Sequence, residues 1–282
     1  MTHTATQPSE SPVIGVFDSG FGGLTVLKAL LTHMPHAQYA FLGDTARLPY
    51  GSKSQRTIAR YAAESAQFLV NEQKAEFLVI ACNTASALAM EAIQAAVPVP
   101  VLGVIEPGAA AAAAHSRTRN VLVVATEATV HSHAYAAACQ RQGLHGVEKA
   151  CPLLVPLVEE GWVDHPVTEQ VVSIYLDELM AEAQAAGQRP DTLVLGCTHY
   201  PLLHKVFQSK VPVGVQVIDS AEATAAAAAR MLGLAGRSLR ADAVPAPSIR
   251  CFATDSVEKF ERLGSRFLGH SVGKVSLVDL GG

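Results

Sequence analysis

Short apolar runs recur along the chain, and each ends in a polar or glycine-containing turn. The runs are VIGVF, FLVIA, VLVVA and LVL, at residues 13–17, 77–81, 121–125 and 193–195. Runs of this length without polar alternation predict strands that are buried on both faces, and a helical pattern follows each turn. Strands that alternate with helices predict an α/β fold with doubly wound, mainly parallel sheets. Functional side chains are then expected at the carboxyl ends of the strands.

Two of these predicted strands end alike. FLVIA leads into Cys82-Asn83-Thr84, and the later run TLVLG leads into Cys197-Thr198-His199. The weak internal repeat predicts two pseudo-symmetric domains, with the active site in the cleft between them. A proline-rich stretch and an alanine run after residue 97 indicate where the chain crosses into the second domain. We predict a discontinuous first domain, residues 1–105 plus 219–282, and a second domain, residues 106–218.

Composition narrows the class of protein. A chain of 282 residues, 49% hydrophobic and 16% charged, can bury the cores of two domains and is not expected to be disordered. A net charge of −4 without a basic run argues against a nucleic acid partner. No apolar segment is long enough to span a bilayer, and residues 1–12 do not resemble a secretion signal. We therefore predict a cytoplasmic protein that binds neither membranes nor nucleic acid.

The five cysteines include no CxxC pair, so free thiols are expected rather than disulfides or a structural metal site. Cys82 and Cys197 stand at strand ends, where a following helix N-terminus lowers a thiol pKa and offers amides to a carboxylate. A single cysteine is more often a small buried hydrophobe, and we interpret the other three in this way. The symmetric placement of this pair favours a chemical role at an amino-acid site.

Two further glycine-containing segments invite other interpretations. Asp18 and Ser19 open the turn 20–23, which either approaches a small polar ligand or is an ordinary turn; it fits neither the dinucleotide nor the P-loop fingerprint. GHSVG at residues 269–273 fits the nucleophile elbow of hydrolases, but no histidine follows it. A hydrolase is therefore rejected. A two-domain amino-acid binding protein needs no paired thiols, which counts against that class.

Five segments in order resemble the glutamate racemases, within the wider aspartate/glutamate racemase group. They are FDSGFGGL at 17–24, GDTARLPYG at 43–51, ACNTAS at 81–86, VPLVEEG at 155–161 and GCTHYPLL at 196–203. The resemblance spans nearly the whole chain. It implies cofactor-independent, metal-independent racemisation of free glutamate for peptidoglycan, by one thiolate that removes the α-hydrogen and one thiol that delivers a proton to the opposite face. An aspartate racemase of the same group is the alternative, and the forms GDTARLPYG and GCTHYPLL favour glutamate.

The same resemblance implies roles for individual residues. Cys82 acts on D-glutamate with assistance from Asp18, and Cys197 acts on L-glutamate with assistance from Glu159 and His199. Substrate contacts are expected at the following positions: Asp18, Ser19, Asp44, Tyr50, Gly51, Asn83, Thr84, Thr198 and His199. From the residues alone, Asp44 is equally a turn cap, Glu159 a solvated helix-end charge and His199 a structural hydrogen-bonding group. We expect replacement of Asp44 or His199 by alanine to impair activity and to leave the fold intact.

Some features are left open by the resemblance. The turn at Ala125-Thr126 departs from the glycine that the family tends to have, which leaves the local backbone shape open. A homodimer is the assembly that the family favours, and the sequence does not decide it. Some relatives respond to a sugar-nucleotide activator through an N-terminal extension, whereas only about a dozen residues precede the first predicted strand here. Activator dependence is therefore not predicted.

Overall fold

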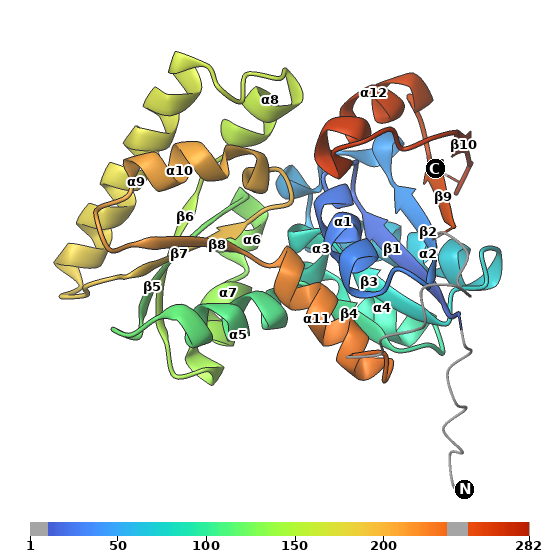
Figure 1. Ribbon diagram of the computed structural model, residues 1–282, viewed down its shortest axis with the longest axis horizontal. Helices are drawn as coiled ribbons and strands as arrows, with labels where there is room; N and C mark the ends of the chain where they lie inside the picture. The colour runs from blue at the N-terminus through green and yellow to red at the C-terminus, as the bar shows by residue number, and fades with distance from the viewer. Residues whose placement is uncertain (1–10, 236–247, 282) are drawn as a thin grey trace, which may run out of the picture.

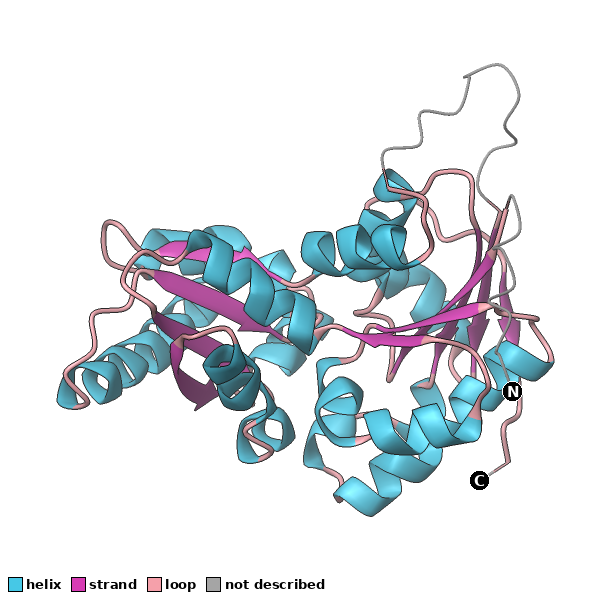
Figure 2. Ribbon diagram, turned by 90° about the horizontal axis from the view of Figure 1, so that it is seen from below, coloured by secondary structure: helices cyan, strands magenta, loops and turns pink. Residues whose placement is uncertain are grey.

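Two parallel β-sheets organise the chain in a computed structural model that describes residues 11–235 and 248–281. Residues 1–10, which carry most of the segment tested for a secretion signal, lie outside the described residues, as do the parts of the predicted first domain at 236–247 and 282. The two sheets lie side by side, each with helices on both faces (Figures 1 and 2). This arrangement confirms the predicted α/β class with two domains.

The first sheet has six strands in the order β10-β9-β2-β1-β3-β4, and all its neighbouring pairs are parallel. Its strands are β1 (Val13–Asp18), β2 (Gln38–Gly43), β3 (Phe77–Ile80), β4 (Val101–Gly103), β9 (Ile249–Ala253) and β10 (Val275–Leu277). We call the part of the chain that builds this sheet the first domain. Its helices are α1 (Leu24–His33), α2 (Gln55–Asn71), α3 (Asn83–Leu88), α4 (Met90–Ala96), α11 (Ala221–Met231) and α12 (Val257–Leu268), with 3₁₀ turns η1 (Thr45–Arg47) and η2 (Tyr50–Ser52).

The second sheet has four parallel strands in the order β6-β5-β7-β8. Its strands are β5 (Asn120–Ala125), β6 (His145–Ala150), β7 (Thr192–Gly196) and β8 (Gln216–Asp219). The second domain, named for this sheet, also contains α5 (Ile105–His115), α6 (Glu127–His131), α7 (Ala134–Arg141), α8 (Leu154–Glu159), α9 (Pro166–Ala185), η3 (Tyr200–Leu203) and α10 (His204–Lys210). The exact boundaries between the domains stay a prediction.

The two domains share one strand order. The sequence β2-β1-β3-β4 in the first sheet corresponds to β6-β5-β7-β8 in the second, so the third strand of each domain lies beside the first. Cys82 follows β3 and Cys197 follows β7, which makes their positions equivalent. In a sheet with this order, the point where the connections change direction lies between the first and third strands, and ligands bind at the carboxyl ends there.

The core explains why the four central runs were recognisable from the sequence. The side chains of β1, β3, β5 and β7 are almost all buried, because helices cover both faces of each sheet. A large cluster of buried apolar residues extends across both domains, and a smaller cluster fills the other face of each sheet. Helix α11 packs on α1 and on α5, and so joins the two domains (Figure 1).

Candidate active site

A cavity of about 390 Å³ lies between the domains, at the carboxyl ends of their strands. Cys82 and Cys197 both line it. The other predicted residues that line it are Ser19, Tyr50, Gly51, Asn83, Thr84, Glu159, Thr198 and His199. Two predicted residues, Asp18 and Asp44, are buried but are not among its lining residues. The fold therefore brings residues from distant parts of the sequence to the walls of one cavity.

Cys82 occupies the N-cap position of α3. Its backbone is extended there, and its sulfur accepts a hydrogen bond of 3.4 Å from the backbone N–H of Ala85. The thiol in turn donates to the Oγ of Ser19, also at 3.4 Å. Burial raises the pKa of Cys82 to about 12, and the nearby carboxylate of Asp18 adds to this shift. Burial and the Asp18 charge therefore disfavour the thiolate of Cys82, although the contacts with the Ala85 amide and the Ser19 hydroxyl oppose part of this effect.

Asp18 ends β1 directly behind the turn that carries Ser19. The residue is 1% exposed, and its Oδ2 accepts a 3.0 Å hydrogen bond from the backbone N–H of Gly20. Its Oδ1 has no hydrogen-bond partner among the described residues. Burial raises the pKa of this carboxyl, against the lowering effect of His199 and of the turn amides. A buried carboxyl with a raised pKa and a free oxygen is suited to exchanging a proton near Cys82.

Cys197 has different surroundings. The residues after β7 form a turn and then the 3₁₀ helix η3, so no α-helix begins directly at the thiol. The Nδ1 of His199 lies 4.0 Å from the Cys197 sulfur and 3.4 Å from the Oγ1 of Thr198. On the other side of the ring, Nε2 lies 3.4 Å from Glu159 Oε1, within ion-pair distance but without hydrogen-bond geometry. The thiol of Cys197, the imidazole of His199 and the carboxylate of Glu159 thus follow one another along the cavity wall, and we call them the His199 row.

The ionisation of this row is set by its neighbours. Burial alone would lower the pKa of His199, but its contacts with Cys197 and Glu159 outweigh burial and raise that pKa to about 10. Burial would raise the pKa of Glu159, but His199 and Lys259 outweigh it and lower the pKa. Because the geometry and the charges agree on an ion pair, we describe His199 as protonated and Glu159 as ionised. The protonated imidazole therefore lies beside the Cys197 sulfur, at 4.0 Å.

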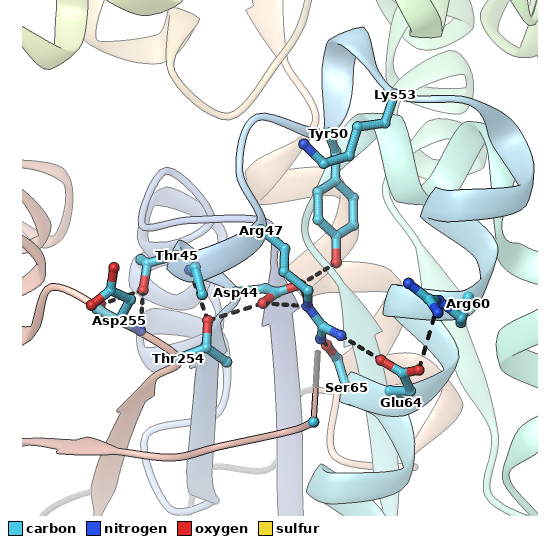
Figure 3. A network of polar contacts seen from close by, with 12 residues as sticks. Asp44, Thr45, Arg47, Tyr50, Lys53, Arg60, Glu64, Ser65, Thr254 and Asp255 are labelled. Carbon is cyan, nitrogen blue, oxygen red and sulfur yellow. Dashed lines mark hydrogen bonds and ion pairs between the residues drawn. The ribbon is translucent and has the colours of Figure 1, made fainter.

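Asp44 belongs to a polar network behind the cavity wall (Figure 3). Its carboxylate accepts hydrogen bonds from the Tyr50 hydroxyl at 2.5 Å, from Arg47 Nε at 2.8 and 2.9 Å, and from the Thr254 hydroxyl at 2.9 Å. Arg47 also pairs with Glu64. Both carboxylate oxygens are therefore occupied, and Asp44 holds the loop that presents Tyr50 and Gly51 to the cavity.

This network changes what we expect of Asp44. The sequence suggested that alanine at this position would leave the fold intact. A fully buried carboxylate that binds an arginine, a tyrosine and a threonine changes that expectation, because its removal leaves the buried Tyr50 hydroxyl and the half-buried Arg47 and Thr254 without their acceptor. Its Thr254 partner is 210 residues away in sequence. Asp44 stands at the N-cap position of η1, but its side chain makes no capping hydrogen bond there and does not line the cavity.

Two hydrogen-bonded groups join the domains beside the thiols. The hydroxyl of Thr84 lies 3.0 Å from that of Thr126 and 3.3 Å from that of Thr129, so α3 is linked to the start of α6. The hydroxyl of Tyr135 donates a 2.7 Å hydrogen bond to the Oδ1 of Asn83, and both groups are buried. At Ala125-Thr126 the sequence departs from the glycine that the family tends to have. Thr126 of this turn contacts Thr84, a predicted substrate-binding residue, across the cleft.

Sequence reasoning missed several residues of the site. Cys151 lines the cavity, although we interpreted it as a buried hydrophobe; it is indeed fully buried and has a pKa raised above its ordinary value by burial. Lys259, whose Nζ lies 3.1 Å from Glu159 Oε2, also went unrecognised. Glu160 lines the cavity beside Glu159, but only Glu159 contacts His199. The Asn-Thr and Thr-His pairs after the cysteines were the only local signals.

Within residues 11–235 and 248–281, no group of three or more His, Cys, Asp or Glu side chains is arranged to hold a metal ion. In the same parts of the chain, no helix has the length and apolar character needed to cross a membrane. The five cysteines are free thiols, as expected.

Comparisons with known proteins agree with one another. The sequence matches the Asp/Glu/Hydantoin racemase family over residues 24–228. It is 56% identical to a glutamate racemase from Koribacter versatilis, over 97% of this chain and 99% of the relative. The crystal structure of glutamate racemase from Francisella tularensis in complex with D-glutamate superposes with a TM-score of 0.83 at 33% identity. That match covers 96% of this chain and 99% of the other.

An aspartate racemase is less similar. The structure of the enzyme from Picrophilus torridus has a TM-score of 0.55 and 20% identity, and the match covers 79% of this chain and 95% of that chain. At this identity the comparison shows a shared fold only.

Proposed function

The chain belongs to the Asp/Glu/hydantoin racemase family, and we propose that it interconverts free L-glutamate and D-glutamate. It is one of the glutamate racemases of that family, and thus an amino-acid racemase and an isomerase. The single observation that carries the mechanism is the placement of two free thiols, Cys82 and Cys197, on the walls of one cavity at equivalent strand ends. Each thiol has its own ionisable neighbour, Asp18 for Cys82 and His199 with Glu159 for Cys197.

The proposed reaction needs only proton transfers. One thiolate takes the α-hydrogen of the substrate as a proton, and the electron pair of the broken C–H bond stays on the α-carbon. The other cysteine, present as a thiol, then donates its proton to the opposite face of that carbon. Cys197 acts as the base toward L-glutamate and Cys82 toward D-glutamate, so the two cysteines exchange roles when the direction reverses.

The remaining cavity residues suit the substrate. Backbone amides at the start of α3, together with the hydroxyls of Ser19, Thr84 and Thr198, can donate hydrogen bonds to the carboxylates of glutamate. The same donors stabilise the negative charge that develops when the α-proton leaves. The side chain of Tyr50 is held by Asp44 and contributes a wall rather than a free hydroxyl.

Three related expectations belong to this proposal. We propose that the D-glutamate serves peptidoglycan synthesis, which is the role of the family, and that the reaction requires neither metal nor organic cofactor. Activity should persist after exhaustive dialysis against a chelator, and its restoration by zinc or pyridoxal phosphate would contradict that expectation. Homodimer formation and a cytoplasmic location stay predictions.

Chiral chromatography tests the function directly. Purified protein is incubated with L-glutamate or, in parallel, with L-aspartate, and the enantiomers are separated over time. We expect D-glutamate to approach an equal mixture and L-aspartate to remain unchanged. Racemisation of aspartate in preference to glutamate would support the alternative member of the group.

Deuterated water tests the two-base assignment. At early times the D-glutamate formed from L-glutamate should carry deuterium at its α-carbon, while recovered L-glutamate stays mostly unlabelled. A single base that served both faces would label both enantiomers.

A further inference from the structure

An ion pair connects the two domains at the outer end of the His199 row. Glu159 ends α8 in the second domain, and its Oε2 lies 3.1 Å from Nζ of Lys259 in α12 of the first domain. These two helices face each other across the same edge of the molecule (Figure 1). The other carboxylate oxygen of Glu159 faces His199 at 3.4 Å. One carboxylate thus bridges a lysine of one domain and an imidazole of the other.

Aromatic rings of the first domain surround the same groups. The ammonium of Lys259 lies 5.7 Å from the centroid of the Phe21 ring. Phe21 contacts the His199 ring at a centroid distance of 6.0 Å, and Phe267 of α12 meets His199 edge-on at 5.1 Å. The imidazole that supports Cys197 is therefore held between rings that belong to the opposite domain.

Stability does not account for Lys259. Its side chain is 42% exposed, and an ion pair with one partner so exposed contributes little to the stability of the fold. Its position at the end of the row has a more specific effect, because together with His199 it lowers the pKa of Glu159.

We infer that Lys259 is a positioning residue for the Cys197 side of the reaction: it holds Glu159 against His199, and it does so only while the two domains are in contact. This inference rests on the proposed racemase function. The row behind Cys197 is then complete only when α12 and α8 lie together, whereas Cys82, Ser19 and Asp18 all belong to the first domain. Approach of the domains therefore assembles one of the two acid–base groups.

The charges around the row give the sign of the effect. Glu159 is faced by His199 from the turn after β7 and by Lys259 from α12, while the guanidinium of Arg266, also on α12, lies beside Gly161 just after α8. His199 faces Cys197, Glu159 and, across the domains, Asp18. Lys259 lowers the pKa of Glu159, so removing its charge raises that pKa. Glu159 then stays ionised, and paired with the His199 imidazole, only down to a higher pH.

The test compares Lys259→Met, which keeps an unbranched apolar stem, with Lys259→Arg and with Arg262→Met. Arg262 lies on the same helix and is exposed, so its replacement removes an equal charge outside the row. We expect kcat/KM for glutamate to fall about tenfold in Lys259→Met, which corresponds to the modest coupling of a residue that acts through another. The acid limb of the pH profile should move to higher pH. The Lys259→Arg variant should keep most of the activity, and Arg262→Met should match the wild type.

A second readout assigns the effect to one side. The two enantiomers are equally stable, so kcat/KM must fall by the same factor in both directions and cannot identify the side. Exchange of the α-hydrogen for deuterium identifies the side, provided that one of the two thiols has been removed. We expect Lys259→Met to slow exchange of L-glutamate in the Cys82→Ser background and to leave exchange of D-glutamate unchanged in the Cys197→Ser background.

Several results would overturn the inference while leaving the racemase proposal intact. They are a wild-type pH profile in Lys259→Met, an equal loss in Arg262→Met, or equal slowing of exchange for both enantiomers. Failure of the wild-type protein to racemise glutamate would instead reject the proposed function itself.

Discussion

The two cysteines end equivalent strands, but the groups that support them come from different places. In the first sheet Phe17 pairs with Ile80, so Asp18 stands beside the residue that precedes Cys82. In the second sheet Ala125 pairs with Gly196, which directly precedes Cys197. Alanine thus occupies, beside Cys197, the position that the carboxylate occupies beside Cys82. The missing group is replaced by His199, two residues after the thiol, and by Glu159 from another element.

The repeat thus preserves the positions of the two thiols, but it does not preserve the ionisable groups that surround them. On the Cys82 side the support is a buried carboxyl with a raised pKa, and it is local to one domain. On the Cys197 side it is a protonated imidazole, and Phe21, Phe267 and Lys259 of the other domain contact its row. The carboxyl on the Cys82 side and the imidazole on the Cys197 side can therefore be removed by separate substitutions.

The largest effect should come from the thiols themselves. A serine hydroxyl is far less acidic than a thiol, so Cys82→Ser and Cys197→Ser should each reduce racemisation by about 10³-fold or more in both directions. The remaining thiol can still remove and return a proton on its own face. In deuterated water, Cys82→Ser should therefore label L-glutamate alone and Cys197→Ser should label D-glutamate alone, by mass spectrometry after chiral separation. Labelling of both enantiomers by either variant would show that the sides are not separate.

Cys139 offers a control for these variants. It is fully buried in the second domain and does not line the cavity, so Cys139→Ala should keep wild-type activity.

The next effect should come from the supporting groups. Asp18→Asn and His199→Gln should each lower kcat/KM by about 10²-fold, the scale of one acid–base contribution. Their effects on stability at pH 7 should have opposite signs, and melting temperatures measured across pH reveal them. If both variants shifted the melting temperature at pH 7 equally and in the same direction, the groups that support Cys82 and Cys197 would not differ in charge.

The signs follow from the pKa shifts. Folding raises the pKa of the Asp18 carboxyl above 3.8. Between 3.8 and the pKa of the folded state, the folded protein binds more protons than the unfolded chain, so the stability of the fold decreases as the pH rises through this range. Asparagine carries no charge to bury and should be more stable at pH 7. His199 has its pKa raised from 6.5 to about 10, so its stabilisation is complete below pH 6.5 and disappears as pH rises through 10. The His199→Gln variant should therefore have a lower melting temperature at pH 7, and it should not lose stability as the pH rises through 10.

A smaller effect should follow at Gly22, in the turn of the first domain that touches the second. A Cβ at this position would lie 2.4 Å from the Thr198 hydroxyl oxygen and 2.7 Å from Nδ1 of His199. Gly22→Ala should therefore keep the domains apart and lower kcat/KM by about tenfold. Small-angle scattering should show a larger radius of gyration. Wild-type activity and dimensions would show that the turn moves aside at no cost.

The smallest effect on activity should come from Asp44, which lies behind the wall on the Cys82 side. Asp44→Ala should raise KM several-fold, because Tyr50 loses its anchor, and should lower the melting temperature by about 6 °C or more. Tyr50→Phe removes one hydrogen bond and leaves Arg47 and Thr254 in place, so it should cost only about 2–4 °C. A melting temperature of Asp44→Ala equal to that of the wild type would restore the role of a substrate contact.

The sequence was informative where the physical signal was local. The four central strands are short apolar runs because helices bury both their faces, and their ends located Cys82 and Cys197. Strand β6, with partly exposed and polar residues, and the three-residue β4 and β10 carry no comparable pattern. We did not predict β4 or β6, and we also missed the apolar, buried strand β2.

The contacts of the site were harder to predict, because they join distant segments. Asp44 looked like a turn residue, and the partner that decides its role, Thr254, lies 210 positions away. Lys259 is an ordinary charged residue on an amphipathic helix, and only the packing of α12 opposite α8 gives it meaning. Glu159 was assigned through the family resemblance alone.

The shared strand order of the two domains has a stereochemical consequence. A chain of L-amino acids cannot contain a mirror image of its own site, yet a racemase must treat two mirror-image substrates alike. A twofold rotation about an axis in the plane of the deprotonated α-carbon achieves this, since it exchanges the two faces of that plane without reflection. Such an axis lies along one of the three bonds of that plane and therefore also exchanges the other two substituents, and no two of the three are alike. The repeat can therefore duplicate the proposed proton donors, Cys82 and Cys197, while the groups that hold the substituents have to differ between the halves.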